Sequence, residues 1–151
     1  DKWLNMMRDK LGLFGEEKKD KKLITDLLDW MEKNKADYTN TFCHLMDIKS
    51  NDDIYKETNF LDWTHRWKIR SKLNNSSKEK QIKLMKLYNP IVIPRNHKVE
   101  EALTEADKGN LDKIVRLLDV LKNPYGNRDI ISEYRLPSPK GDKKYQTFCG
   151  T

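Results

Sequence analysis

The segment from residue 89 to residue 125 constrains the fold of this chain more than any other stretch. It reads NPIVIPRNHKVEEALTEADKGNLDKIVRLLDVLKNPY, so an Asn-Pro pair stands near each end. Proline lacks a backbone N–H and restricts the residue before it, and each pair is therefore expected to end a helix. Between the pairs, apolar residues recur at steps of three and four, which is the spacing of an amphipathic helix. The pattern predicts two helices joined as a helical hairpin.

The corner of this hairpin is predicted at Gly109 and Asn110. Glycine fits the left-handed position just past a helix end, and the asparagine side chain can accept a backbone N–H at the start of the next helix. Pro94 is expected in the first turn of the first helix, where its missing N–H costs little. The two apolar faces must bury against each other and against something else, although a purely structural hairpin is the simpler interpretation. The first face contains Val99, Ala102, Leu103 and Ala106, and the second contains Leu111, Ile114, Val115, Leu117, Leu118 and Leu121.

The remainder of the chain predicts a mainly α protein, an irregular helical domain that ends in the αα-hairpin and an extended tail. Asp20 is expected to cap the second helix, and Ser76 with Glu79 to form a capping box for the fifth. We expect a helical module over residues 1–125 and a mostly irregular tail over 126–151, with one turn of helix near residues 130–133. The tail ends in FCGT.

Composition narrows the class of protein. The 151 residues carry a net charge of +6, and 36% of them are apolar and 36% charged, which suits one ordinary domain with a heavily charged surface. Basic and acidic residues are interleaved, which favours a solvated surface over a nucleic-acid-binding face. No apolar run of membrane-spanning length and no secretion leader is recognised, and two cysteines are too few for a disulfide framework. The sequence therefore predicts a cytoplasmic protein without a membrane partner, and its start inside a helical pattern suggests that it is part of something longer.

No complete catalytic constellation is recognised. The histidines His44, His65 and His97 do not follow a zinc-ligand spacing, and neither a phosphate-binding glycine loop nor a nucleophile elbow is found. We therefore predict no catalytic, cofactor-binding or metal site in this chain. Trp63 and Trp67 lie four residues apart on one helix face, where they could stack bases, but large core or interface anchors are the favoured interpretation.

The two cysteines have different surroundings. Cys149 stands three residues from the end, and an accessible thiol in such a tail can reach a partner thiol and respond to redox conditions. An unreactive tail cysteine remains the alternative. Cys43 lies between Phe42 and Leu45 on a predicted helix and is expected to be a small core residue.

Three segments together resemble the C-terminal part of the selenoprotein O family of pseudokinase-fold protein adenylyltransferases. They are residues 7–45, residues 88–125 with their NPIVIPRNH and NPY motifs, and the terminal YQTFCGT of residues 145–151. The resemblance covers nearly the whole chain in the family's order and is weakest between residues 50 and 80.

The resemblance implies a function for the longer parent protein. Full-length members transfer AMP from ATP to hydroxyl side chains of protein substrates, with ATP and Mg²⁺ held in an upstream kinase-like body. None of the nucleotide or metal motifs of that body occurs here, so the isolated chain is expected to be inactive and to have the upstream body as its partner. Some members regulate activity through a redox-active cysteine or selenocysteine near the end, and Cys149 is the matching position. A mitochondrial location would apply if the chain came from a eukaryotic member.

Two further hypotheses stay open at this point. The chain could be a free-standing helical interaction or nucleic-acid-binding module that uses the hairpin and the face of Trp63 and Trp67. It could also be a metal or redox protein. The main hypothesis is the helical C-terminal portion of an adenylyltransferase, which braces the catalytic body and presents the thiol of Cys149.

Overall fold

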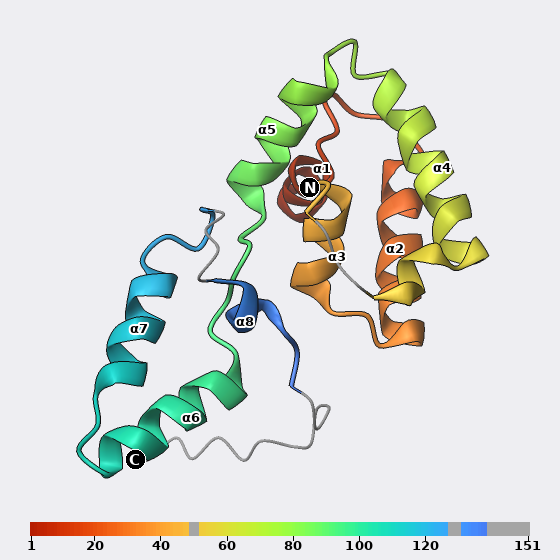
Figure 1. Ribbon diagram of the computed structural model, residues 1–151. Coiled ribbons are helices and arrows are strands. Elements are labelled where there is room, and N and C mark those ends of the chain that lie inside the picture. Colours follow the sequence, from red (N-terminus) through yellow and green to blue (C-terminus); the bar gives the residue numbers. More distant parts are fainter. Residues whose placement is uncertain (49–51, 127–130, 139–151) are drawn as a thin grey trace. The chain divides into compact units, whose positions relative to one another are not determined.

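The structure, a computed structural model, describes residues 1–48, 52–126 and 131–138, and within these ranges it contains helices and no strand. The mainly α class predicted from the sequence is thus confirmed, and the predicted hairpin is present as α6 and α7 (Figure 1). The elements are α1 (Lys2–Lys10), α2 (Asp20–Asn34), α3 (Tyr38–Leu45), the 3-10 helix η1 (Asp53–Lys56), α4 (Thr58–Lys72), α5 (Lys78–Tyr88), α6 (Asn96–Asp107), α7 (Asp112–Leu121) and α8 (Ser132–Arg135).

The chain divides into two compact units, the first covering Asp1–Pro90 and the second beginning at Ile91. This division falls inside the region predicted as one helical module, at the first of the two Asn-Pro pairs. Proline at position 90 cannot continue a helical ladder, which gives the boundary a local cause. The one-turn helix expected near residues 130–133 corresponds to α8 in the second unit.

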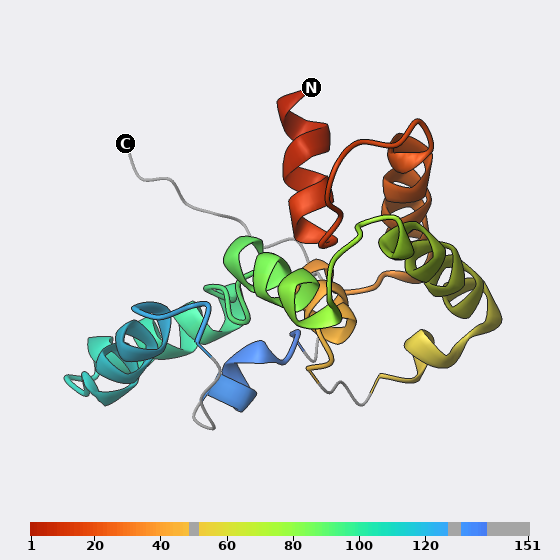
Figure 2. The ribbon, with the colours of Figure 1, turned by 90° about the horizontal axis from the view of Figure 1, so that it is seen from above.

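The core of the first unit forms where α2 and α4 pack together, and the two helices lie side by side in both views (Figures 1 and 2). Apolar residues of α2 recur at helical spacing, and Leu23, Ile24 and Leu27 among them are buried. The aromatic rings of Trp30, Tyr55 and Phe60 meet there, with centroids 4.5 Å apart for Trp30 and Phe60. The fully or nearly buried apolar residues of this core include Leu23, Ile24, Leu27, Met31, Phe42, Phe60 and Trp63.

Helix α1 is held against α5 at its C-terminal end. The Lys10 ammonium donates a hydrogen bond of 2.9 Å to the carbonyl oxygen of Tyr88. In return, the buried amide of Asn89 donates to the carbonyl oxygens of Lys10 and Met85, each at 2.8 Å. The carbonyls of Lys10 and Tyr88 lie at helix ends, where the last carbonyls lack intrahelical partners, and these two bonds satisfy them. The asparagine of the first Asn-Pro pair thus joins two helices as well as ending one.

The hairpin of the second unit turns at Gly109 and Asn110, as the sequence predicted, although the N-cap position of α7 is Leu111 and not Asn110. Backbone hydrogen bonds close the base of the hairpin. The carbonyl oxygen of Pro124 accepts hydrogen bonds from the backbone N–H groups of Ile91 (2.7 Å) and Val92 (3.3 Å). At the corner, Gly109 adopts a left-handed φ of 86°. The Asn110 side chain accepts the N–H of Asp112 at 3.0 Å.

Three other local predictions were wrong in detail. Pro94 precedes α6 instead of lying in its first turn, because the helix begins at Asn96. The cap of α5 is Ser77, whose hydroxyl accepts the N–H of Lys80, and not Ser76. Asp20 gives α2 no cap, because its carboxylate turns inward to two arginines.

None of the described helices combines the length and the apolar character that a membrane crossing requires.

Candidate functional site

The most concentrated group of charges in the interior surrounds Asp20. Its carboxylate is fully buried and accepts hydrogen bonds from Arg8 Nε at 2.7 Å and from Arg70 Nε at 2.6 Å. The backbone N–H of Glu17 also donates to it at 3.0 Å. Burial pushes the pKa of Asp20 up, but these hydrogen bonds and the nearby positive charge outweigh burial and place the pKa below its ordinary value. The carboxylate is therefore held ionised, as a brace between α1, α2 and α4.

A cleft of about 780 Å³ opens beside this cluster, between the start of α2 and the outer side of α4. Half of the residues that line it are basic, but the two arginines among them already have acidic partners. Arg70 is bound to Asp20, and Arg66 lies 2.6 Å from Asp26. An ion pair that is satisfied within the fold stabilises helix packing, so the two arginines of the cleft are explained without a ligand. The lining residues are Glu17, Lys18, Lys19, Asp20, Lys22, Leu23, Arg66, Ile69, Arg70 and Leu73.

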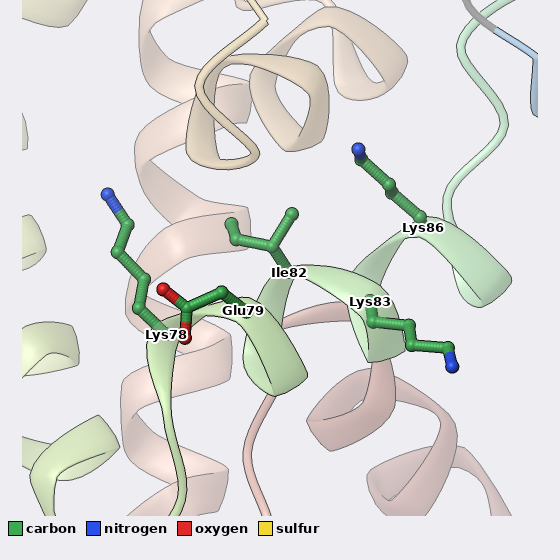
Figure 3. Close-up of a pocket in the computed structure, with 5 residues that line it drawn as sticks. All are labelled: Lys78, Glu79, Ile82, Lys83 and Lys86. Atoms are coloured by element: carbon green, nitrogen blue, oxygen red, sulfur yellow. The ribbon is translucent and has the colours of Figure 1, made fainter.

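A shallower hollow of about 420 Å³ lies along α5 (Figure 3). Ile82 and Lys86 point to the same side of the helix, whereas Lys83 points away from them. Lys78 forms an ion pair of 2.8 Å with Asp47, and Glu79 is the one carboxylate in the lining. A hydrogen bond from Ser77 lowers the pKa of Glu79. A single exposed, ionised carboxylate beside lysines provides neither a nucleophile nor a base poised near neutral pH.

Trp63 and Trp67 belong to the core, as predicted. Their exposed fractions are 2% and 7%, and their rings stack with centroids 6.1 Å apart. Each indole N–H is satisfied inside the fold, that of Trp63 by the carbonyl of Leu23 at 2.8 Å and that of Trp67 by the carbonyl of Leu11 at 2.9 Å. The two ring faces are therefore unavailable for stacking on bases.

The histidines are dispersed in the structure as they are in the sequence. Burial lowers the pKa of His44, whose ring stacks on Tyr55 with a centroid distance of 4.2 Å. His65 is exposed on α4, and His97 lies on α6. Across residues 1–48, 52–126 and 131–138, no three His, Cys, Asp or Glu side chains come together in an arrangement that could hold a metal ion.

Cys43 is completely buried, and its thiol lies 3.9 Å from the carbonyl oxygen of Pro90, which agrees with the core position predicted for it. Beside it, the Lys10 ammonium lies 4.9 Å from the centroid of the Phe42 ring. Burial lowers the pKa of Lys10. Cys149, the redox candidate, lies outside the described residues, as does the whole FCGT terminus.

Sequence reasoning missed the cluster of Asp20, Arg8 and Arg70. The two arginines stand 12 and 50 residues from the aspartate. No local pattern links residues that far apart, and an aspartate at a helix start is ordinarily a cap. The one available signal was the position of Arg8 and Arg70 beside apolar residues of their helices.

Comparison with known proteins identifies the family. The family model described as protein adenylyltransferase SelO matches residues 1–122. The protein nucleotidyltransferase YdiU of Pelagibacter ubique (strain HTCC1062) is 52% identical over 154 residues, covering 99% of this chain and 31% of that protein. The protein nucleotidyltransferase YdiU of Nitrosococcus oceani is 45% identical, and the match covers 99% of this chain and 31% of that protein. The protein nucleotidyltransferase YdiU of Clostridium beijerinckii is also 45% identical, and the match covers 100% of this chain and 31% of that protein.

The chain therefore belongs to the SelO family, of which it represents the C-terminal region. The resemblance identified from the sequence motifs is confirmed. The chain spans about a third of the length of the curated relatives that it matches.

Proposed function

We propose that this chain is the helical C-terminal portion of a cytoplasmic protein adenylyltransferase, which transfers AMP from ATP to hydroxyl side chains of protein substrates. Nucleotide and Mg²⁺ belong to the upstream part of the intact polypeptide. The match to the SelO family over residues 1–122 is the observation that carries the proposal. The relatives, which bear the name protein nucleotidyltransferase, support it.

Within that enzyme, this portion has two proposed tasks. It braces the catalytic body, and its rigid first unit suits this task because α1, α2 and α4 are joined through the buried Asp20 cluster. It also carries Cys149, which we propose to respond to redox conditions by forming a disulfide with a thiol of the upstream body. Two thiols lose two electrons and two protons to a disulfide-containing oxidant when that bond forms.

The proposal is tested on the intact gene product, incubated with Mg²⁺ and ATP labelled either at the α-phosphate or at the γ-phosphate. Transfer of AMP labels protein with the α-label and not with the γ-label, whereas a kinase gives the reverse. Protein labelled from α-labelled ATP alone is the expected result. Absence of α-label on protein under every condition would overturn the proposed activity, and the isolated 151-residue chain serves as the negative control.

The role of Cys149 is tested in the same assay, with and without reductant, on the natural protein and on Cys149→Ala. We expect AMP label to rise on reduction of the natural protein and to be independent of reductant in the variant. Cys43→Ala is the control, because that thiol is buried in the core, and its response to reductant should match that of the natural protein. If the amount of AMP label changes neither with reductant nor with Cys149→Ala, the proposed redox role is wrong. Bracing of the catalytic body would then be the one proposed task that remains.

A further inference from the structure

The exposed side of α7 carries a row of apolar residues, which we call the α7 stripe. Leu111, Val115 and Leu118 follow one another at steps of four and three residues and therefore lie on one face of the helix. Their exposed fractions are 58%, 63% and 54%. Side chains of this kind stabilise a fold by leaving water, so three of them in a row on one face indicate a surface that is covered by a partner.

The α7 stripe is additional to the side of the helix that faces the hairpin core. Leu117 and Val120, on the other side, are buried with exposed fractions of 7% and 0%. A helix at the surface of a finished domain needs one apolar face and presents polar residues on the opposite one. α7 has apolar residues on both, and its second face has no role within the described part of the unit.

The basic residues of α7 do not shield the stripe. Long Lys and Arg side chains can lie over apolar surface, but here two of them are drawn to acidic residues of neighbouring helices. Lys113 pairs with Glu101 of α6, and Arg116 lies 3.8 Å from Glu133 of α8. These pairs leave the apolar row open between charged residues, a pattern typical of an interface with a polar rim.

We propose that the α7 stripe packs against the upstream part of the same polypeptide, an inference that rests on the proposed function. The match to the three relatives spans 31% of their length, so more than two thirds of each lies outside the region that this chain represents. The family match continues to residue 122 and thus includes the whole stripe. An upstream segment in the same polypeptide is present at high effective concentration, which favours it over a second copy.

The experiment places a photo-crosslinking amino acid on the stripe of the intact gene product. Val115→benzoylphenylalanine is irradiated, and mass spectrometry of the digest locates the attachment point. The expected result is a cross-link within one polypeptide to a peptide upstream of residue 1. Glu100→benzoylphenylalanine is the matched control, since Glu100 is an exposed residue of the same hairpin that lies outside the stripe, and it should give no such cross-link.

Three results would overturn the inference. A cross-link between two copies, recognised from a mixture of light and heavy isotope-labelled protein, would make the stripe a self-association surface. A cross-link to a peptide of residues 139–151 would assign it to the tail of the chain. No cross-link, or an equal upstream yield from position 100, would mean that the upstream part does not select the stripe.

A second variant keeps the test independent of the cross-linking chemistry. Val115→Asp should lower the melting temperature of the intact protein by several degrees, because the carboxylate would be buried at the interface. It should change that of the 151-residue chain by less than about one degree, since position 115 is exposed there. Equal shifts in both proteins would contradict the inference. Failure of the proposed function can be distinguished from failure of this inference. The first appears as absence of AMP label on the unmodified intact protein, and the cross-linking result does not affect that measurement.

Discussion

Two aspartates of α2 have similar partners but different surroundings. Asp20 is bound by Arg8 and Arg70, and the side chains of all three are 9% exposed or less. Asp26 is bound by Lys22 and Arg66, whose side chains are 78% and 49% exposed. Water can therefore replace the partners of Asp26 far more readily than it can replace those of Asp20. The same chemical change at the two positions should therefore have very different consequences.

Asp20→Asn should lower the free energy of unfolding by about 3–5 kcal/mol, because it leaves the buried Arg70 without a counter-charge and leaves Arg8 only its exposed partner Glu16. Asp26→Asn is the control and should cost about 1 kcal/mol or less, as exposed ion pairs do. Urea unfolding followed by circular dichroism measures both. Equal losses at the two positions would mean that the buried cluster contributes no more than a surface pair.

The Asp20 cluster also predicts the direction in which pH affects stability. The pKa of this carboxyl is lower in the folded protein than its ordinary value, so its contribution is complete above about pH 3.9. That contribution is lost as the pH falls through the folded-state pKa, because protonation then favours the unfolded chain. Unfolding free energies measured between pH 5 and pH 2 should thus fall more steeply for the natural chain than for Asp20→Asn. Parallel curves would assign the acid sensitivity to other carboxylates.

At the scale of elements, the loop between α1 and α2 contains two glycines with similar backbone angles and different neighbours. Gly12 has a φ of 65° and Gly15 a φ of 70°. A Cβ added to Gly12 would lie 2.5 Å from Cγ of Gln81 and 2.9 Å from Cγ of Met85 on α5, whereas a Cβ on Gly15 would meet nothing within 4 Å. The first glycine therefore permits a close approach to α5 as well as a left-handed turn.

Gly15→Ala should cost about 1–2 kcal/mol, the strain of a left-handed alanine. Gly12→Ala should cost a further 1–3 kcal/mol or so, because side chains of α5 must also move. Thermal unfolding of the two variants gives the comparison. A loss at Gly12 no larger than that at Gly15 would show that α5 adapts to the added methyl group without cost.

The local sequence pattern predicted the positions of helices more accurately than it predicted their caps and their buried faces. Periodic apolar residues between the two Asn-Pro pairs predicted a hairpin of two helices, which is present as α6 and α7. The apolar residues predicted to form one broad buried face of α7 lie on two sides of the helix, one buried and one exposed. Periodicity records which residues are apolar and not what covers them. The inward turn of Asp20 could not be predicted for a related reason, since its partners come from other helices.

At the scale of the whole molecule, the first unit contains its own core and all four tryptophans of the chain. A truncated chain of residues 1–90 should therefore unfold cooperatively, with the shift in tryptophan emission that accompanies exposure of Trp63 and Trp67. Fluorescence during denaturant titration measures this. Emission typical of an unfolded chain in the absence of denaturant would show that this unit depends on the residues that follow it.

The function was inferred from a different kind of information than the fold was. The spacing of residues shows no familiar catalytic motif. The family was identified from motifs in residues 7–45, 88–125 and 145–151 and from the family match over residues 1–122, which periodicity and charge do not explain. Physical reasoning from one sequence can place Trp63 in a core, whereas membership of a family is recognised from matching motifs.

The closed base of the hairpin has a consequence for the order of folding. The carbonyl of Pro124 joins Ile91 and Val92, so both helices of the hairpin and the bonds that close it lie within one short stretch of chain. The loop-closure entropy for such a stretch is modest, and contacts between near neighbours in sequence form early. The α6–α7 hairpin is accordingly suited to form without waiting for distant residues. Hydrogen-exchange labelling during refolding measures the order in which backbone amides become protected. The amides of the α6–α7 hairpin should be protected before those of the helices joined by the Asp20 cluster, in which Asp20 and Arg70 are 50 residues apart in the sequence.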